Sequence, residues 1–214
     1  EMRNLRKDFN LMIDVVINDI SKKSEWFQKY LAGKEPGKDY FIEVDPDADL
    51  SEVVRPRSLP LLKKVETPDG KTHVWTTFSD DQIDLDFSNP EVLLEMVKVL
   101  LHYLDNGATM IRMDAIAFLW KKIGTTCLHL PETHEIVKLL RDIMETVDPD
   151  SILLTEINVP NLENLSYFGN GDETHMVYQF SLPPLLLHAL YTGNSRYFKQ
   201  WASSIPELPD ECTF

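Results

Sequence analysis

Charged side chains follow three apolar segments of the chain, where they could act together on one substrate. Asp14 and Asn18 belong to the first segment, Arg112 and Asp114 to the second, and Glu156 ends the third. Two carboxyl groups held about 5–5.5 Å apart form the catalytic pair of a retaining glycosidase. One of them attacks the sugar, and the other donates and later recovers a proton. Glycosyl transfer is therefore the chemistry that these residue types suggest.

The neighbours of each carboxyl group favour different roles. Arg112 and Asp114 are two residues apart and point to the same side of a strand, so the guanidinium would keep Asp114 ionised, as a nucleophile requires. Glu156 follows the apolar residues 152–154, where partial desolvation would raise its pKa toward that of a general acid. Simpler roles remain open, because a carboxyl at a strand end often caps a helix and an Arg-x-Asp pair is often only an ion pair.

Apolar segments alternate with helical patterns along the chain, which predicts an α/β fold with parallel strands. The expected strands are residues 11–18, 73–78, 108–114, 151–156 and 176–180, and the expected helices are residues 24–31, 90–105, 131–147 and 185–201. Ligand sites in such folds gather at the carboxyl ends of the strands. Four parallel strands cannot close a barrel of eight, so the sheet is either open or part of a barrel.

The composition is that of a folded globular protein and excludes several functional classes. The 214 residues include 21 basic and 35 acidic side chains, and the net charge of −14 argues against binding to nucleic acid or to an anionic membrane surface. No apolar stretch reaches the roughly 18 residues of a membrane span, and residues 1–4 do not resemble a signal peptide. Cys127 and Cys212 lack metal or redox spacing, which favours a cytoplasmic location.

Two features of the chain suggest how it is organised. Residues 33–81 are polar and rich in Pro, Asp and Gly, and so large an irregular insertion in a compact domain usually has a function. The sequence also opens with Glu1 instead of a start methionine and stops at Phe214 without a terminal helix or polar tail. We therefore expect a fragment of a longer protein.

The chain resembles the α-amylase family of glycoside hydrolases, family 13, over nearly all its length. Residues 14–18 (DVVIN), 111–115 (IRMDA) and 153–156 (LLTE) resemble the first three conserved regions of that family, and residues 82–86 with Asn89-Pro90 resemble the segment that follows its inserted domain B. The resemblance implies part of a (β/α)8 TIM barrel, about strands three to six. Residues 1–32 and 82–214 would belong to the barrel, truncated at both ends, and residues 33–81 would be the domain B-like insertion.

Within the family, the chain is most similar to the sucrose phosphorylase subgroup. The likeness lies in residues 124–127 (GTTC) and 177–185 (VYQFSLPPL). Gln179 stands where a sucrose-specific enzyme would have Asp. This difference favours a relative with another acceptor, such as a glucosylglycerate phosphorylase.

Two departures from the family pattern affect the expected site. Asn18 is followed by Asp19, where the family has a His that hydrogen-bonds the sugar, and an ionised Asp cannot donate such a bond. The fourth conserved region, which carries a third catalytic carboxylate, is expected beyond Phe214. The expected site within these residues is therefore incomplete.

The resemblance implies a role for each candidate residue. Asp114 would be the nucleophile and Glu156 the acid/base, and Arg112 would orient Asp114. The residues expected to contact the sugar are Asp14, Asn18, Trp75 and His175.

The implied reaction is retaining α-glucosyl transfer through a covalent glucosyl-enzyme. Phosphorolysis of sucrose or glucosylglycerate is the leading hypothesis, with a small sugar and inorganic phosphate as substrates and with no metal or organic cofactor. An α-glucosidase or amylase-like hydrolase, and a relative that keeps the barrel but has lost catalysis, remain alternatives. The oligomeric state stays open.

Overall fold

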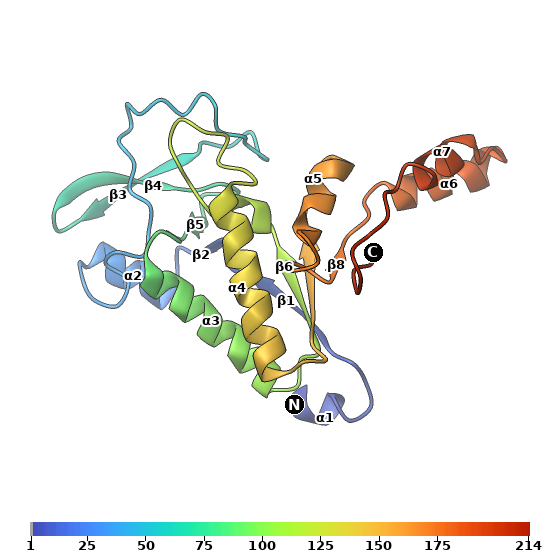
Figure 1. Ribbon diagram of the computed structural model, residues 1–214. Helices are drawn as coiled ribbons and strands as arrows, with labels where there is room; N and C mark the ends of the chain where they lie inside the picture. Colours follow the sequence, from blue (N-terminus) through green and yellow to red (C-terminus); the bar gives the residue numbers. More distant parts are fainter. Residues whose placement is uncertain (1) are drawn as a thin grey trace.

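The computed structural model describes residues 2–214, and its main core is built on a parallel sheet of four strands (Figure 1). These are β1 (Met12–Val16), β6 (Met110–Asp114), β7 (Ile152–Glu156) and β8 (Met176–Val177), in that order across the sheet. All three neighbouring pairs run parallel, so the predicted α/β fold with parallel strands is confirmed.

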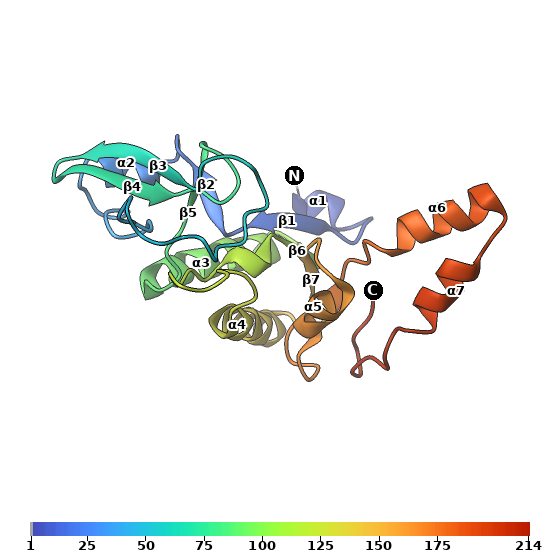
Figure 2. The same cartoon turned by 90° about the horizontal axis from the view of Figure 1, so that it is seen from above.

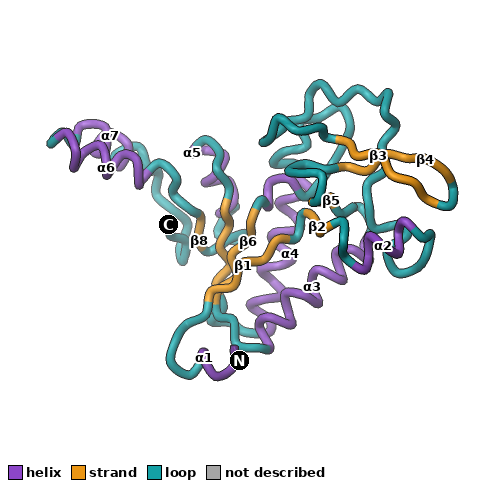
Figure 3. Tube along the Cα trace, turned by 180° about the vertical axis from the view of Figure 1, so that it is seen from behind, coloured by secondary structure: helices purple, strands orange, loops and turns teal. Residues whose placement is uncertain are grey.

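Two long helices cover one face of this sheet. They are α3 (Pro90–Asp105) and α4 (Pro131–Val147), and each has a proline in its first turn, as expected. Their buried apolar side chains recur at helical spacing and join the core of the sheet: Val92, Met96, Leu100, Leu104, Ile136, Val137, Leu140 and Met144. Figure 3 shows the molecule from behind, with the strands lying in front of these helices.

The strands sort their side chains between the two faces by alternation. Ile111 and Met113 of β6 and Leu153 of β7 are buried in the core beneath the helices. Arg112 and Asp114 alternate with Ile111 and Met113 along β6 and therefore point to the opposite face, which these helices leave uncovered. That face carries the polar groups identified from the sequence.

The insertion contains more regular structure than expected. One strand was predicted at residues 73–78, but β3 (Leu62–Thr67) and β4 (Gly70–Trp75) form an antiparallel hairpin (Figure 1). The first strand escaped prediction because its sequence, LKKVET, buries only Val65. A further antiparallel pair joins β2 (Asp19–Ser21) to β5 (Gln82–Asp84) beside the parallel sheet. The division into three segments at residues 32 and 81 stays a prediction.

The C-terminal helix predicted at residues 185–201 is wrong, because two helices occupy this region. They are α6 (Leu182–Thr192) and α7 (Arg196–Ala202). Gly193 ends α6 in the left-handed conformation with φ of 67°, which glycine adopts at little cost. Figures 1 and 2 show both helices extending away from the sheet.

The shorter helical segments lie in the connections between these elements. They are α1 (Met2–Leu5), α2 (Glu25–Leu31), α5 (Asn161–Leu165) and the two 3-10 turns η1 (Ile116–Phe118) and η2 (Ser166–Phe168). Ser24 caps α2 by accepting a hydrogen bond from the backbone nitrogen of Phe27, as its position predicts. Among residues 2–214, none of the helices combines the length and apolar character needed to cross a membrane.

Candidate active site

The two carboxyl groups predicted to act together lie side by side at the carboxyl edge of the sheet. Asp114 ends β6 and Glu156 ends β7, and the two are register partners across these parallel strands. They therefore point to the same face, with backbones about 4.8 Å apart. Both line a cavity of about 410 Å³. The two carboxyl groups are therefore neighbours that face one cavity.

Arg112 lies at the centre of three carboxylates. Its Nη1 donates to Asp14 Oδ1 at 2.5 Å and lies 3.8 Å from Asp114 Oδ2, while its Nη2 lies 3.7 Å from Glu156 Oε1. Asp14 reaches it because the two residues are register partners on β1 and β6. The guanidinium thus contacts all three carboxyl groups that the sequence analysis identified.

The environment of Glu156 favours its neutral form. Burial is the largest cause that raises the pKa of Glu156 to about 7, and the hydrogen bond and negative charge of Asp114 raise it further. The positive charge of Arg112 opposes this shift. The direction agrees with the expectation from the apolar residues before Glu156. A carboxyl with this pKa can both give and take a proton near neutral pH.

The backbone turns sharply directly after Asp114. Ala115 adopts a left-handed conformation with φ of 55°, which a residue with a Cβ rarely takes, and η1 follows. The backbone nitrogen of Ala115 donates to the carbonyl oxygen of Glu156 at 3.2 Å. Strained backbone of this kind is common at functional sites. Here it ties the ends of β6 and β7 together beside the cavity.

The expected sugar contact by Asn18 is wrong, because its side chain is fully buried and its polar groups are already bonded. Asn18 Nδ2 donates to Asp84 Oδ2 at 3.1 Å, and Asn18 Oδ1 accepts from Lys121 Nζ at 2.8 Å. Lys121 Nζ also lies 2.6 Å from Asp84 Oδ2. The ammonium group of Lys121 therefore provides the positive charge within this buried cluster.

Asp19 is also turned into the protein. It is buried on β2 and accepts hydrogen bonds from Asn18 Nδ2 at 3.3 Å and Gln82 Nε2 at 3.2 Å. Burial is the main cause that raises the pKa of Asp19. The residue that stands in place of the family His is thus bonded to its own chain.

Two other expected sugar contacts are wrong as well. Trp75 is buried in the small core of the insertion and donates from Nε1 to Thr77 Oγ1 at 3.1 Å, so its ring has no free face for a sugar. His175 lies before β8, toward the amino-terminal edge of the sheet. Its Nδ1 accepts from the backbone nitrogen of Leu153 at 3.0 Å, and its Nε2 lies 3.3 Å from Glu145 Oε1.

The cavity has further lining residues that the sequence analysis did not identify. Arg57 comes from the insertion, Phe78 follows β4, and Phe118 belongs to η1. The rings of Phe78 and Phe118 pack edge to face with centroids 5.3 Å apart. No local pattern marked Arg57 as a cavity residue, because exposed arginines are common in polar loops.

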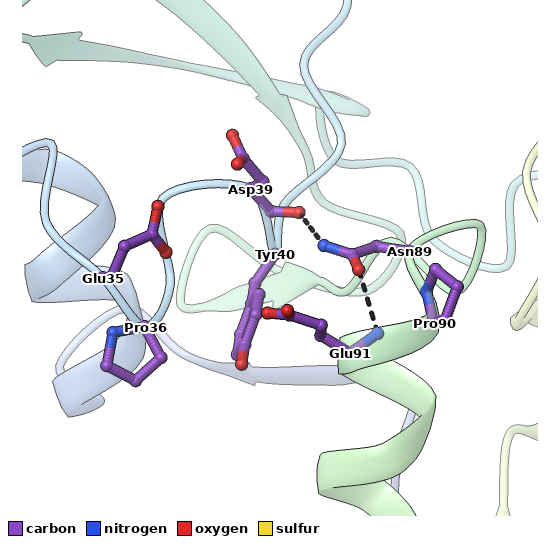
Figure 4. A pocket seen from close by; sticks show the side chains of 7 residues that line it. All are labelled: Glu35, Pro36, Asp39, Tyr40, Asn89, Pro90 and Glu91. Atoms are coloured by element: carbon purple, nitrogen blue, oxygen red, sulfur yellow. Dashed lines mark hydrogen bonds between the residues drawn. The ribbon is translucent and has the colours of Figure 1, made fainter.

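A second cavity, of about 760 Å³, lies away from Asp114 and Glu156, between the insertion and the start of α3 (Figure 4). Asn89 organises it: its Oδ1 accepts from the backbone nitrogen of Glu91 at 2.9 Å, and its Nδ2 donates to the carbonyl of Asp39 at 2.8 Å. These contacts cap α3 and attach it to the insertion, which is a structural role.

The chain is similar to known proteins over nearly all of its length. The model of the α-amylase catalytic domain matches residues 2–206. Glucosylglycerate phosphorylase of Spirochaeta thermophila is 52% identical over 205 residues, covering 96% of this chain and 35% of the relative. Glucosylglycerate phosphorylase of Escherichia coli is 53% identical over 215 residues, covering 100% and 38%. The chain thus spans little more than a third of these relatives.

A solved structure shows the same fold. Sucrose 6F-phosphate phosphorylase from Thermoanaerobacter thermosaccharolyticum matches 96% of this chain and 44% of its own, with a TM-score of 0.83 and 23% identity. At that identity the likeness concerns the fold alone. The four parallel strands correspond to part of a (β/α)8 barrel, as predicted. The chain belongs to the α-amylase family of glycoside hydrolases.

Proposed function

We propose that the protein transfers α-glucosyl groups with retention of configuration. The observation that carries this proposal is the register pairing of Asp114 and Glu156 at one sheet edge, with Arg112 in contact with both. Carboxyl groups on neighbouring strand ends suit the short separation of a retaining pair, which leaves no room for a water between nucleophile and sugar. Membership of the α-amylase family supports the same reaction class.

In the first step, Asp114 attacks the anomeric carbon while Glu156 protonates the oxygen of the leaving group. The glycosidic bond breaks, and an ester bond between Asp114 and glucose forms. In the second step, Glu156 takes the proton of the acceptor, whose oxygen displaces Asp114. Two inversions leave the α configuration unchanged. Arg112 lies 3.8 Å from Asp114 and holds that side chain in place for its attack.

We propose inorganic phosphate as the acceptor, which makes glucose 1-phosphate the product. Two observations support it: the names of the similar phosphorylases, and the guanidinium of Arg57 in the same cavity as the catalytic pair. A guanidinium can bind two phosphate oxygens at once. The same names favour glucosylglycerate over sucrose as the donor.

The proposed mechanism uses only protein side chains, the sugar and phosphate, with no metal or organic cofactor. Asp14 would contact the sugar from beneath, since it lies on the same face as Arg112. The cytoplasm stays our proposed location, because Cys127 and Cys212 are both free thiols.

The test uses the full-length protein that carries this chain, supplied with glucosylglycerate or sucrose in the presence or absence of phosphate. We expect phosphate-dependent release of glucose 1-phosphate. Asp114→Asn should lower turnover by on the order of 10³-fold or more, and Glu156→Gln by about 10² to 10⁴-fold. Asp142→Asn, an equal change on the exposed side of α4, should retain parent activity.

The covalent intermediate provides a direct check. With α-glucosyl fluoride, which needs no protonation of its leaving group, Glu156→Gln should accumulate a glucosyl group on Asp114 that peptide mass spectrometry detects. Parent-level turnover by Asp114→Asn would exclude the proposed nucleophile. Release of glucose that does not depend on phosphate would instead favour the hydrolase.

A further inference from the structure

We propose that Tyr178 is a positioning residue that holds Arg112 between the two catalytic carboxyl groups; this inference rests on the proposed function. The Cζ atom of Arg112 lies 5.3 Å from the centroid of the Tyr178 ring. A cation within about 6 Å of an aromatic centroid is attracted by the electrons of the ring face. Tyr178 thus gives Arg112 a contact that does not involve a carboxylate.

Arg112 needs such a contact because its three carboxylates do not hold it equally. Its shortest bond, 2.5 Å, goes to Asp14, whose side chain is 57% exposed. The distances to Asp114 and Glu156 are 3.8 and 3.7 Å. An ion pair with an exposed partner contributes little to fixing a long side chain. Contact with the ring restricts the guanidinium to the position between β6 and β7.

The ring itself is anchored to the strand of the proposed acid/base. The backbone nitrogen of Tyr178 donates to the carbonyl of Thr155, the residue before Glu156, at 3.2 Å. Its carbonyl oxygen accepts from Asn164 Nδ2 at 2.7 Å, and Asn164 is buried. These bonds fix the backbone of Tyr178 on both sides of its side chain. The ring can therefore hold Arg112 of β6 at a fixed place relative to β7.

The charge of Arg112 acts on the protonation of Glu156, so the position of Arg112 affects the proposed acid/base. Within the described residues, the charged groups that face Glu156 are Asp14 and Asp114, which favour its protonated form, and Arg112, which disfavours it. Arg57 lines the same cavity from the insertion. If Arg112 loses the ring and moves away, the pKa of Glu156 should rise.

The experiment compares two substitutions in the full-length protein. Tyr178→Leu removes the ring, and Tyr178→Phe keeps the ring while removing the hydroxyl. Tyr191→Leu makes the same chemical change at an exposed position on α6 and serves as the matched control. The readout is the titration of Glu156, followed by NMR of ¹³C-labelled glutamate carboxyls and assigned with Glu156→Gln.

We expect Tyr178→Leu to raise the measured pKa of Glu156 by about half a pH unit, because the displaced guanidinium attracts the Glu156 carboxylate less strongly. The high-pH limb of the activity profile should move upward equally. Tyr178→Phe and Tyr191→Leu should titrate like the parent. A parent-like titration of Tyr178→Leu, or an equal shift in Tyr178→Phe, would overturn the inference.

The titration separates this inference from the proposed function. If the parent protein transfers no glucosyl group, the NMR titration still reports whether Tyr178 controls Arg112. If the protein is active but Glu156 titrates identically in both Tyr178 variants, only the positioning role fails.

Discussion

At the scale of single residues, Glu156 shows how its neighbours decide the chemistry of one carboxyl group. Its side chain is 20% exposed and lies beside the negative charge of Asp114, and both conditions favour the protonated form. Arg112 reduces this effect without cancelling it. In the proposed mechanism, this raised pKa lets Glu156 act as the proton donor near neutral pH.

The raised pKa of Glu156 also makes the unfolding free energy of the protein depend on pH. Burial raises the pKa of Glu156 from the usual 4.5 to about 7, so the folded state binds a proton that the unfolded chain releases above pH 4.5. The stability that this proton supplies is fully present below pH 4.5 and is lost as pH rises through 7. Glu156→Gln should therefore exceed the parent in unfolding free energy by about 2–3 kcal/mol at pH 8, and by less than about 1 kcal/mol at pH 5.

Urea denaturation at the two pH values measures this difference. Glu52→Gln makes the same change at an exposed position of the insertion and should give equal stability differences at both pH values. If Glu156→Gln behaves like Glu52→Gln, the carboxyl of Glu156 titrates near its ordinary value in the folded protein.

At the scale of elements, the buried carboxylate of Asp84 joins the insertion to the barrel segment. Asp84 ends β5 and accepts hydrogen bonds from the backbone nitrogen and hydroxyl of Thr77 at 2.8 and 2.6 Å. Lys121, from the connection after η1, supplies the opposing charge. A buried carboxylate of this kind is tolerated only while its cation stays in place.

Removing that cation should therefore destabilise the protein strongly. Lys121→Met keeps most of the side-chain volume but leaves Asp84 buried without a counter-charge, which should cost about 3–5 kcal/mol of unfolding free energy. The neighbouring Lys122→Met provides the matched control, because Lys122 is exposed, and should change stability by less than about 0.5 kcal/mol. Equal denaturation curves for the two variants would show that the ion pair contributes little.

The elements differ in how well their sequences predicted them. The boundaries of α4 were predictable because Pro131 opens it and five apolar side chains recur at helical spacing. The hairpin strand β3 was not, because the contacts that bury Val65 come from distant residues. The break between α6 and α7 had a local signal in Gly193, which the apolar pattern on either side concealed.

At the scale of the whole molecule, apolar surface concentrates on α6 and on the uncovered face of the sheet. Leu187, Leu190 and Tyr191 are 68%, 74% and 91% exposed, and Met12 is 48% exposed. Contiguous apolar patches on a protein surface promote association. Residues 1–214 on their own should therefore self-associate.

Light scattering and soluble yield of residues 1–214 test this expectation. Leu187→Glu combined with Leu190→Lys should lower the associated fraction at least severalfold, because charge interrupts the patch. Leu162→Glu changes a leucine of α5 that is 79% exposed and should have little effect, since α5 lies apart from α6 in Figure 1. A monomeric, fully soluble parent chain would contradict the prediction, as would equal effects of both changes.

The sequence by itself determined the α/β class, the family and the pair Asp114 and Glu156. An apolar run and the polar residue that ends it are local features of the sequence, and they indicated which residues stand at the carboxyl ends of the strands. Only the tertiary structure decided which other polar groups reach the cavity. It buried Asn18 and Trp75 in hydrogen bonds and placed Arg57 of the insertion beside the carboxyl pair. Such choices depend on contacts between residues distant in the chain, which no local pattern encodes.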